Sequence, residues 1–359
     1  MKSSRVARVF TRKALKVQLF RVTSVLLGLA AVFTLAEIAL RVVGWPAPGF
    51  YVKGHGPVKL RNPGRDGGAF PPSEIGELRH YDYDVEWTVN KYGFRDSEIT
   101  PRRPGEWRIG ILGDSFTAGV GVKQAERFTD IFGETLRRRR PNVSVWNLGA
   151  PLCGTACEAE MFNRVDPEYR LDEIVLAFYG GNDVEENSDW YLSDAKLSSV
   201  RPEEGLTFKI KGWLREHSRV ATFLWVNAIR ASATFRPPGI FNEADLNRYW
   251  PDTERSLRRL QDLAGLRRLT ILYLPASPEW SDVVWQDMRQ RYKTPDEGRH
   301  LVRNALEGWS RQQGIRFVDG TDWLRTCTSP MDCVFPVDAH WNAHAQMLVA
   351  QGLLTQTTW

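Results

Sequence analysis

The chain has 359 residues, of which 42% are apolar and 25% charged, and its formal net charge is +5. This length allows one large core with appendages, and the composition is that of an ordinary globular protein. Residues 1–21 hold seven basic residues and no acidic one, so the rest of the chain is slightly acidic and gives no support for nucleic-acid binding.

An apolar stretch follows this basic tail, from Val22 to Leu40, with Glu37 as its one charge. A helix of about 20 apolar residues crosses a bilayer, and basic residues before it favour a cytoplasmic N-terminus. We predict a cytoplasmic tail over residues 1–21 and a transmembrane anchor over residues 22–43 in the inner (cytoplasmic) membrane, with the body periplasmic or extracellular. The alternative is a signal peptide cleaved after a small residue such as Ala36, but the apolar run is long for one.

The body divides into a lead-in segment and one domain. Residues 44–105 are rich in Gly, Pro and aromatic residues, and we predict an irregular segment with a short strand near Val85–Val89. Over residues 106–359, apolar runs of strand length alternate with helical patterns, which predicts a parallel sheet covered by helices on both faces. The predicted strands are Arg108–Leu112, Val143–Leu148, Glu173–Phe178, Arg268–Leu274 and Arg316–Val318, and the clearest helices are Phe128–Arg139 and Glu254–Ala264.

A stretch at about 187–251 interrupts this alternation. Within it, apolar residues recur at helical spacing between Lys209 and Ala231. We expect an inserted helix that packs on the domain, with a lid or a second contact with the membrane surface as alternatives.

The four cysteines favour disulfides if the body is exported. We predict at least one bond and favour Cys327–Cys333, which brackets a short turn. Cys153 and Cys157 are equally close in sequence, and the sequence leaves the pairing open. A zinc site is not favoured, because neither spacing is C-x2-C.

Polar residues follow the predicted strands and converge on one edge of the sheet, where ligands bind in parallel α/β folds. Ser115, after the first strand, is a candidate nucleophile that needs a base. Asp338 and His340 are two residues apart, so an extended loop would place both side chains on one face. We predict that His340 is the base and Asp338 its orienting acid. The backbone N–H groups of Ser115 and Gly149 and the side-chain amide of Asn182 are the predicted oxyanion donors.

These residues lie in four blocks, GDSFTAG, NLGAP, GGND and DAHWN, whose content and order resemble the SGNH hydrolases, also called the GDSL esterase/lipase family. The resemblance runs from about Trp107 to the C-terminus. The upstream NKYGFRDSE is similar to the lead-in of membrane-anchored bacterial members. The resemblance implies a flavodoxin-like three-layer α/β/α sandwich, acyl-ester chemistry, and no metal or other cofactor. Phe116 departs from the leucine of the family name.

We therefore predict a serine-dependent hydrolase of acetyl or other short-chain esters, on an acetylated glycan or a lipid of the cell envelope or outside the cell. The same triad would serve an acyltransferase on an envelope glycan. A catalytically silent glycan-binding module is a further alternative, which the intact Ser115 and His340 disfavour. A metal site at Asp338, His340 and His344 is also conceivable, but we expect His344 on the solvated face of the last helix.

Overall fold

The computed structural model describes residues 3–45, 49–52, 56–58, 70, 72–188, 213–214, 217–232 and 239–356. The chain forms two compact units, one made of Met1–Pro46 and Arg201–Ser232, the other of Ala47–Val200 and Ala233–Trp359. The second unit contains the α/β domain and its lead-in segment.

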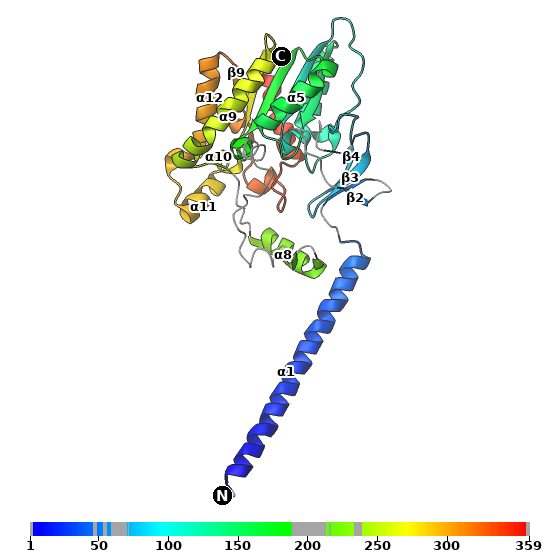
Figure 1. Cartoon of the computed structure of the whole chain (residues 1–359), viewed down its shortest axis with the longest axis vertical. Coiled ribbons are helices and arrows are strands. Elements are labelled where there is room, and N and C mark those ends of the chain that lie inside the picture. The colour runs from blue at the N-terminus through cyan, green and yellow to red at the C-terminus, as the bar shows by residue number, and fades with distance from the viewer. Residues whose placement is uncertain are drawn as a thin grey trace. The chain divides into compact units, whose positions relative to one another are not determined.

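Five parallel strands form the central sheet of the second unit (Figure 1). They are β5 (Trp107–Gly113), β6 (Val143–Gly149), β7 (Glu173–Tyr179), β8 (Arg268–Leu274) and β9 (Arg316–Asp319). Their spatial order is β6-β5-β7-β8-β9. If the five strands are numbered 1 to 5 by their order in the sequence, this arrangement is 2-1-3-4-5. This is the flavodoxin-like order, with its switch point between β5 and β7. The predicted fold class is confirmed.

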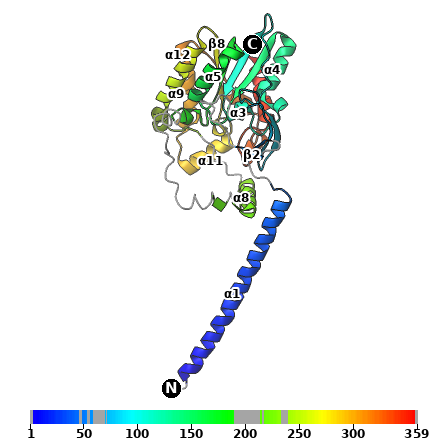
Figure 2. The ribbon, with the colours of Figure 1, turned by 45° about the vertical axis from the view of Figure 1, so that its right-hand side comes forward.

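Helices cover both faces of this sheet. On one face lie α5 (Thr155–Tyr169), α9 (Glu243–Ala264) and α12 (Leu301–Gln313), side by side in Figures 1 and 2. On the other lie α4 (Phe128–Arg139) and α14 (Ala343–Thr355), which pack together. The short helices are α3 (Ser115–Ala118), η1 (Gln124–Glu126), α10 (Ser277–Trp280), α11 (Asp282–Tyr292), η2 (Asp296–His300), α13 (Thr321–Leu324) and η3 (Pro330–Asp332).

The sheet is buried because its strands are apolar on both sides. All seven residues of β7 are buried. Ile174, Leu176 and Phe178 belong to the core under α5, α9 and α12, whereas Val175 and Ala177 belong to the core under α4 and α14. This alternation is what a strand between two helical layers requires.

The lead-in segment is more regular than its sequence indicates. It contains an antiparallel sheet in the order β2-β1-β3-β4, formed by β1 (Gly49–Val52), β2 (Gly56–Val58), β3 (Ile75–Arg79) and β4 (Asp84–Thr88). The prediction of an irregular segment was therefore wrong for these residues, although the strand near Val85–Val89 is present as β4. Strands of three to five residues, with glycine in three of them, are too short to show a clear alternation.

The lead-in also enters the core of the α/β domain. Trp87 and Phe94 are fully buried in the cluster that includes Leu112 and Leu176. The buried Arg95 guanidinium stacks on Trp87, 4.0 Å from the ring centroid, and donates to the Gly119 carbonyl at 2.6 Å. Because Gly119 ends α3, this segment supports the turn that carries Ser115.

The predicted insertion is shorter than expected at its C-terminal end. Helix α9 begins at Glu243, well before the predicted helical pattern at Glu254, and accommodates Pro251 within it. Residues 189–212, 215–216 and 233–238 of the predicted insertion lie outside the described residues.

In the part of the first unit that the structure describes, helices α1 (Ser3–Val42) and α8 (Arg219–Ser232) contact each other. Within Lys16–Val42 of α1, the most apolar stretch has a mean hydropathy of 2.1 and is unburied, so this helix is long and apolar enough to cross a membrane. The sequence favoured packing of the inserted helix on the α/β domain, but α8 belongs to the unit of α1.

Both cysteine pairs are bonded, Cys153 to Cys157 and Cys327 to Cys333. The first bond joins the loop after β6 to the first turn of α5, and the second closes the loop between α13 and the last β-bridge. Both loops lie near the carboxyl edge of the sheet, where the predicted site residues are.

We expect both bonds in protein isolated from its native membrane fraction. Each pair falls in one tryptic peptide, so an unreduced digest should give two peptides that resist alkylation and are each lighter by two hydrogens. The paired change Cys153→Ser with Cys157→Ser should lower the free energy of unfolding by about 2 kcal/mol, the chain-entropy value for so short a loop. Four alkylated thiols before reduction would contradict this.

Candidate active site

Ser115 stands where strand β5 ends and helix α3 begins, at the switch point of the sheet. Asp114 is the N-cap of α3, and its side chain accepts from the N–H of Phe116 at 2.8 Å. The helix ends after four residues at Gly119, whose φ of 72° suits glycine. This short turn fixes Ser115 at the edge of the sheet where ligands bind in such folds.

His340 and Asp338 complete a hydrogen-bonded row with Ser115. Nε2 of His340 is 2.8 Å from Ser115 Oγ, and Nδ1 is 2.7 Å from Asp338 Oδ2. An ionised carboxylate only accepts, so Nδ1 carries the proton and Nε2 accepts from the serine hydroxyl. The row is thus arranged to move the hydroxyl proton of Ser115 to His340.

The loop that carries Asp338 and His340 is a turn, and the expected extended conformation was wrong. Ala339 between them has a φ of 69°, in the left-handed region that alanine rarely adopts. Its N–H donates to the Phe335 carbonyl at 3.0 Å, and Phe335 N–H donates to the His340 carbonyl at 2.9 Å. These bonds hold a conformation that costs about 1 kcal/mol or more, and it brings the two side chains together.

The charge of Asp338 is stabilised by its neighbours. Burial by itself raises the pKa of this carboxyl, but the hydrogen bond and charge of His340, the charge of His80 and the hydrogen bond from Tyr83 together lower it below its ordinary value. The carboxylate therefore stays ionised beside His340, which favours the imidazolium that forms when His340 takes a proton.

Residues of the lead-in segment, which no sequence motif marks, hold Asp338 in place. Tyr83 donates its hydroxyl to Asp338 Oδ2 at 2.8 Å. Asp82 accepts from the backbone N–H groups of Val337 and Asp338, at 2.7 and 2.9 Å. Burial, with the charge of Asp338, raises the pKa of Tyr83, so its hydroxyl keeps the proton that it donates. The turn between β3 and β4 is therefore part of the site.

Gly149 lies against the backbone of α3. A Cβ at this position would come within 2.3 Å of the Ala118 nitrogen, so only glycine fits. Its N–H donates to Asn147 Oδ1 at 2.9 Å, and Gly149 does not line the cavity at Ser115. The structure thus places this predicted oxyanion donor beside the turn that carries Ser115, and its N–H is already hydrogen-bonded.

Asn182 follows β7 and lines the same cavity as Ser115. Its amide nitrogen donates to Glu186 Oε1 at 2.7 Å. An amide nitrogen carries two hydrogens, so this bond orients the group and leaves one hydrogen for a second acceptor. The next residue, Asp183, starts the helical turn over residues 183–188 and accepts from the N–H of Tyr179 at 2.8 Å.

A cavity of 490 Å³ opens over Ser115 and His340, and its walls are mainly apolar. Phe70, Leu78, Val120, Pro151 and Leu152 contribute apolar side chains, and Tyr83, Asn182 and Glu186 contribute polar ones. A few placed polar groups in an apolar cavity of this size are typical of small-molecule sites.

The ring of Phe116 packs against the imidazole of His340 and against two further aromatic rings. Its ring stacks on Tyr179 at 3.8 Å between centroids and lies 4.9 Å from the ring of His340. Trp341 meets Phe116 edge-on at 5.0 Å. Phe116 therefore supports the imidazole of His340, and Tyr179 and Trp341 hold the Phe116 ring in place.

The structure does not bring together the residues of the metal alternative. His340 is bonded to Ser115 and Asp338, while Nδ1 of the exposed His344 lies 3.2 Å from the Asp332 carbonyl. Among the described residues, no group of three His, Cys, Asp or Glu side chains could hold a metal ion.

The family model of the GDSL-like lipase/acylhydrolase family matches residues 111–347 of this chain. This range begins within β5 and ends within α14, so it contains all five predicted site residues. None of the curated proteins matches the chain.

The chain is also similar to solved structures, at low sequence identity. One is a member of the lipolytic protein G-D-S-L family from Veillonella parvula, at 15% identity and a TM-score of 0.38, covering 70% of this chain and 98% of that one. A second is a variant of an acetylxylan esterase from Geobacillus stearothermophilus, at 11% and 0.39, covering 71% and 95%. A third is the psychrotrophic esterase EstA from Pseudoalteromonas sp., at 11% and 0.40, covering 69% and 94%.

Removal of the Tyr83 hydroxyl tests the contribution of the lead-in turn. Tyr83→Phe should lower kcat about tenfold with little change in KM, the size expected for losing one hydrogen bond of about 1.4 kcal/mol to a charged group. The ring that lines the cavity remains.

The matched control is Tyr169→Phe, which removes another buried tyrosine hydroxyl, bonded to Asn90 at 3.1 Å. It should destabilise the fold and leave kcat unchanged. Equal kcat values for Tyr83→Phe and the unmodified enzyme would show that this hydroxyl does not act through Asp338.

Proposed function

This chain belongs to the GDSL-like lipase/acylhydrolase family and is a carboxylic ester hydrolase, and we propose that Ser115, His340 and Asp338 are its catalytic triad. The observation that carries the proposal is the hydrogen-bonded row in which His340 Nε2 lies 2.8 Å from Ser115 Oγ and Nδ1 lies 2.7 Å from Asp338. A nucleophile, its base and the orienting acid are thereby within direct reach of one another.

In the proposed acylation step, Ser115 Oγ attacks the ester carbonyl carbon while its proton passes to His340 Nε2. The tetrahedral intermediate then collapses, the C–O bond to the alcohol breaks, and His340 returns the proton to the leaving oxygen. Water repeats the sequence on the acyl-enzyme and releases the acid. Asp338 holds the tautomer of His340 and stabilises its charged form throughout.

The negative charge that develops on the carbonyl oxygen needs donors at the same edge of the sheet. We assign this role to the N–H of Ser115, the side-chain amide of Asn182 and the N–H of Gly149. The amide nitrogen of Asn182 carries a second hydrogen beside the one bonded to Glu186, and the carbonyl oxygen would compete for it with Asp114. Gly149 would have to share its N–H with Asn147, so we expect it to be the weaker donor.

The proposed substrates are acetyl or other short-chain esters of envelope or extracellular compounds, such as acetylated glycans or lipids. The apolar walls around Ser115 favour the acyl side of an ester over a charged group. A glycan acceptor in place of water would make the same residues an acyltransferase.

We propose further that α1 anchors the chain in the inner membrane, with the α/β domain on the periplasmic or outer side. An apolar helix of sufficient length follows a basic N-terminal segment, and basic residues favour the cytoplasmic side. Two disulfides in the body agree with an oxidising compartment.

Substitution of the triad tests the chemistry. Against a panel of chromogenic acyl esters of increasing chain length, Ser115→Ala and His340→Ala should each lose nearly all activity, because members of a triad act as a unit. Asp338→Asn should lose less. Asn182→Ala should lower kcat by roughly 10²–10³, as for one oxyanion donor.

Two further measurements, covalent labelling by an organophosphonate and acyl transfer to an added glycan, complete the test of the proposed chemistry. An organophosphonate should modify Ser115 and no other serine, and each variant should unfold with the free energy of the unmodified enzyme to within about 1 kcal/mol. Full activity of Ser115→Ala would refute the assignment. Acyl transfer that outruns hydrolysis when a glycan is added would identify a transferase.

The orientation is tested on spheroplasts. An external protease should digest the α/β domain and spare the basic tail with α1, because only the tail is expected to face the cytoplasm. A domain that resists the protease until the cells are lysed would contradict the exported position.

A further inference from the structure

Glu37 is the one charged residue in the apolar stretch of α1, and its carboxylate caps the start of α8. Oε1 accepts from the N–H of Arg219 at 2.9 Å, and Oε2 accepts from the N–H of Val220 at 3.0 Å. The Ser218 hydroxyl donates to Oε2 at 3.0 Å. Three donors at a helix N-terminus satisfy a carboxylate that lipid could not solvate.

Two further contacts hold the same pair of helices. Arg41, one turn after Glu37, pairs with it at 2.7 Å and donates to the His217 carbonyl at 3.0 Å. Trp45 packs edge-on against Phe223, with 5.1 Å between ring centroids. The contacts join the C-terminal end of α1 to the first turns of α8.

These contacts fix the depth of the α8 N-terminus in a membrane that α1 spans. The apolar stretch between Arg21 and Arg41 is about 30 Å long at 1.5 Å per residue, which matches the hydrocarbon core. Arg41 then lies at the outer boundary of the hydrocarbon, and Glu37 lies roughly 6 Å inside that boundary. A carboxylate at this depth needs partners from the protein, and the N-terminus of α8 supplies them.

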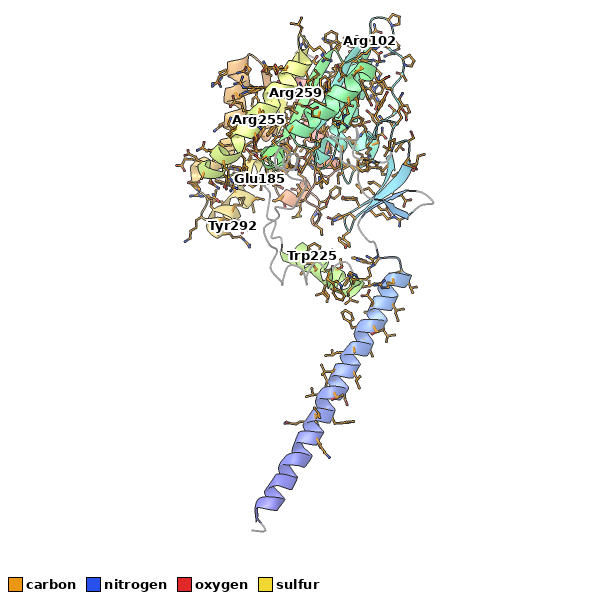
Figure 3. The ribbon with its side chains drawn as sticks, viewed as in Figure 1. Arg102, Glu185, Trp225, Arg255, Arg259 and Tyr292 are labelled. Atoms are coloured by element: carbon orange, nitrogen blue, oxygen red, sulfur yellow. A yellow bond between two sulfur atoms is a disulfide. The ribbon has the colours of Figure 1, made fainter. Side chains whose placement is uncertain are left out.

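Most of the exposed side chains described on α8 and just before it are apolar. Leu224 is 62% exposed, and Trp213 and Leu214, just before the helix, are 58% and 38% exposed. The exposed surface continues that of α1, where Val42 and Ile38 are also exposed. Figure 3 places Trp225 on the same helix. Tryptophan near the end of a spanning helix is typical of the membrane–water interface.

We infer that α8 is an interfacial helix, docked by Glu37 on the outer end of α1, whose exposed apolar face binds the lipid surface. This inference rests on the proposed anchoring by α1. It gives the chain a second attachment to the membrane, within the segment that joins the turn after Asn182 to α9.

The test uses the full chain in vesicles of phosphatidylcholine and phosphatidylglycerol. Leu224→Cys carries an environment-sensitive fluorophore, and the lipids carry a nitroxide quencher just below the headgroup. The native cysteines are bonded and do not react without reductant. The matched control is Leu266→Cys, an exposed leucine of the α/β domain. We expect a blue shift and strong quenching at position 224 and neither at position 266.

Flotation of the vesicles separates the two proposals. Protein that does not float with the vesicles would overturn the anchoring and the docking together. Protein that floats, with a label at position 224 quenched no more than the label at position 266, would overturn the docking of α8 alone and leave the anchor in place.

The role of Glu37 has its own variant. Glu37→Ala should lose most of the quenching at position 224 while flotation is retained, because an apolar residue suits the spanning helix. Glu134→Ala is the control, since Glu134 also pairs with an arginine four residues later, on α4. Unchanged quenching in Glu37→Ala would overturn the assignment of Glu37 as the contact that docks α8.

Discussion

The Asp338 carboxylate must stay ionised and must point at Nδ1 of His340, because only then does Nε2 face Ser115 as an acceptor. The structure meets this requirement from three directions. Asp82 accepts hydrogen bonds from the backbone N–H groups of residues 337 and 338, and Tyr83 donates its hydroxyl to the carboxylate. The left-handed turn at Ala339 orients the imidazole of His340 toward Asp338. Two of these supports come from the lead-in segment, more than 250 positions away in the chain, so the α/β domain does not build its site alone.

Ser115 depends on a second set of buried polar contacts beneath α3. Asn147 donates to the Thr117 carbonyl at 2.7 Å and accepts from Gly149, while its own N–H donates to Asp96 at 2.7 Å. Arg95 binds the Gly119 carbonyl from the other side. A buried network is stable only when its members are satisfied, and here each bond fixes the nucleophile turn or the loop beside it. The NKYGFRDSE block supplies Arg95 and Asp96, which explains why it precedes the domain.

The sequence predicted the features that have strong local signals. Four of the five strands are long, mainly apolar runs, α4 has the predicted bounds, and the motifs identified the residues that meet in one cavity, Ser115, Asn182, Asp338 and His340. Contacts between distant segments leave no such signal. The residues around Tyr83 show no pattern that predicts its hydrogen bond to Asp338. Ala339 has a left-handed conformation, but it is not a glycine or asparagine, the residues that usually indicate one. The bond from Gly149 to Asn147 and the docking of α8 on Glu37 also depend on tertiary packing alone.

The carboxyl groups around the nucleophile have pKa values displaced in opposite directions, and their positions explain why. Asp338, on the base side, is held ionised, where a negative charge stabilises a protonated His340. Asp183 and Glu158 lie behind the proposed oxyanion donor Asn182. Burial, reinforced by repulsion from Asp114 and Glu186, raises both of their pKa values well above the ordinary range. In their neutral forms these two acids add no negative charge of their own beside Asn182, whose amide already binds the Glu186 carboxyl. Environments that separate the pKa values of neighbouring acids in this way let one site stabilise a cation at one end and an anion at the other.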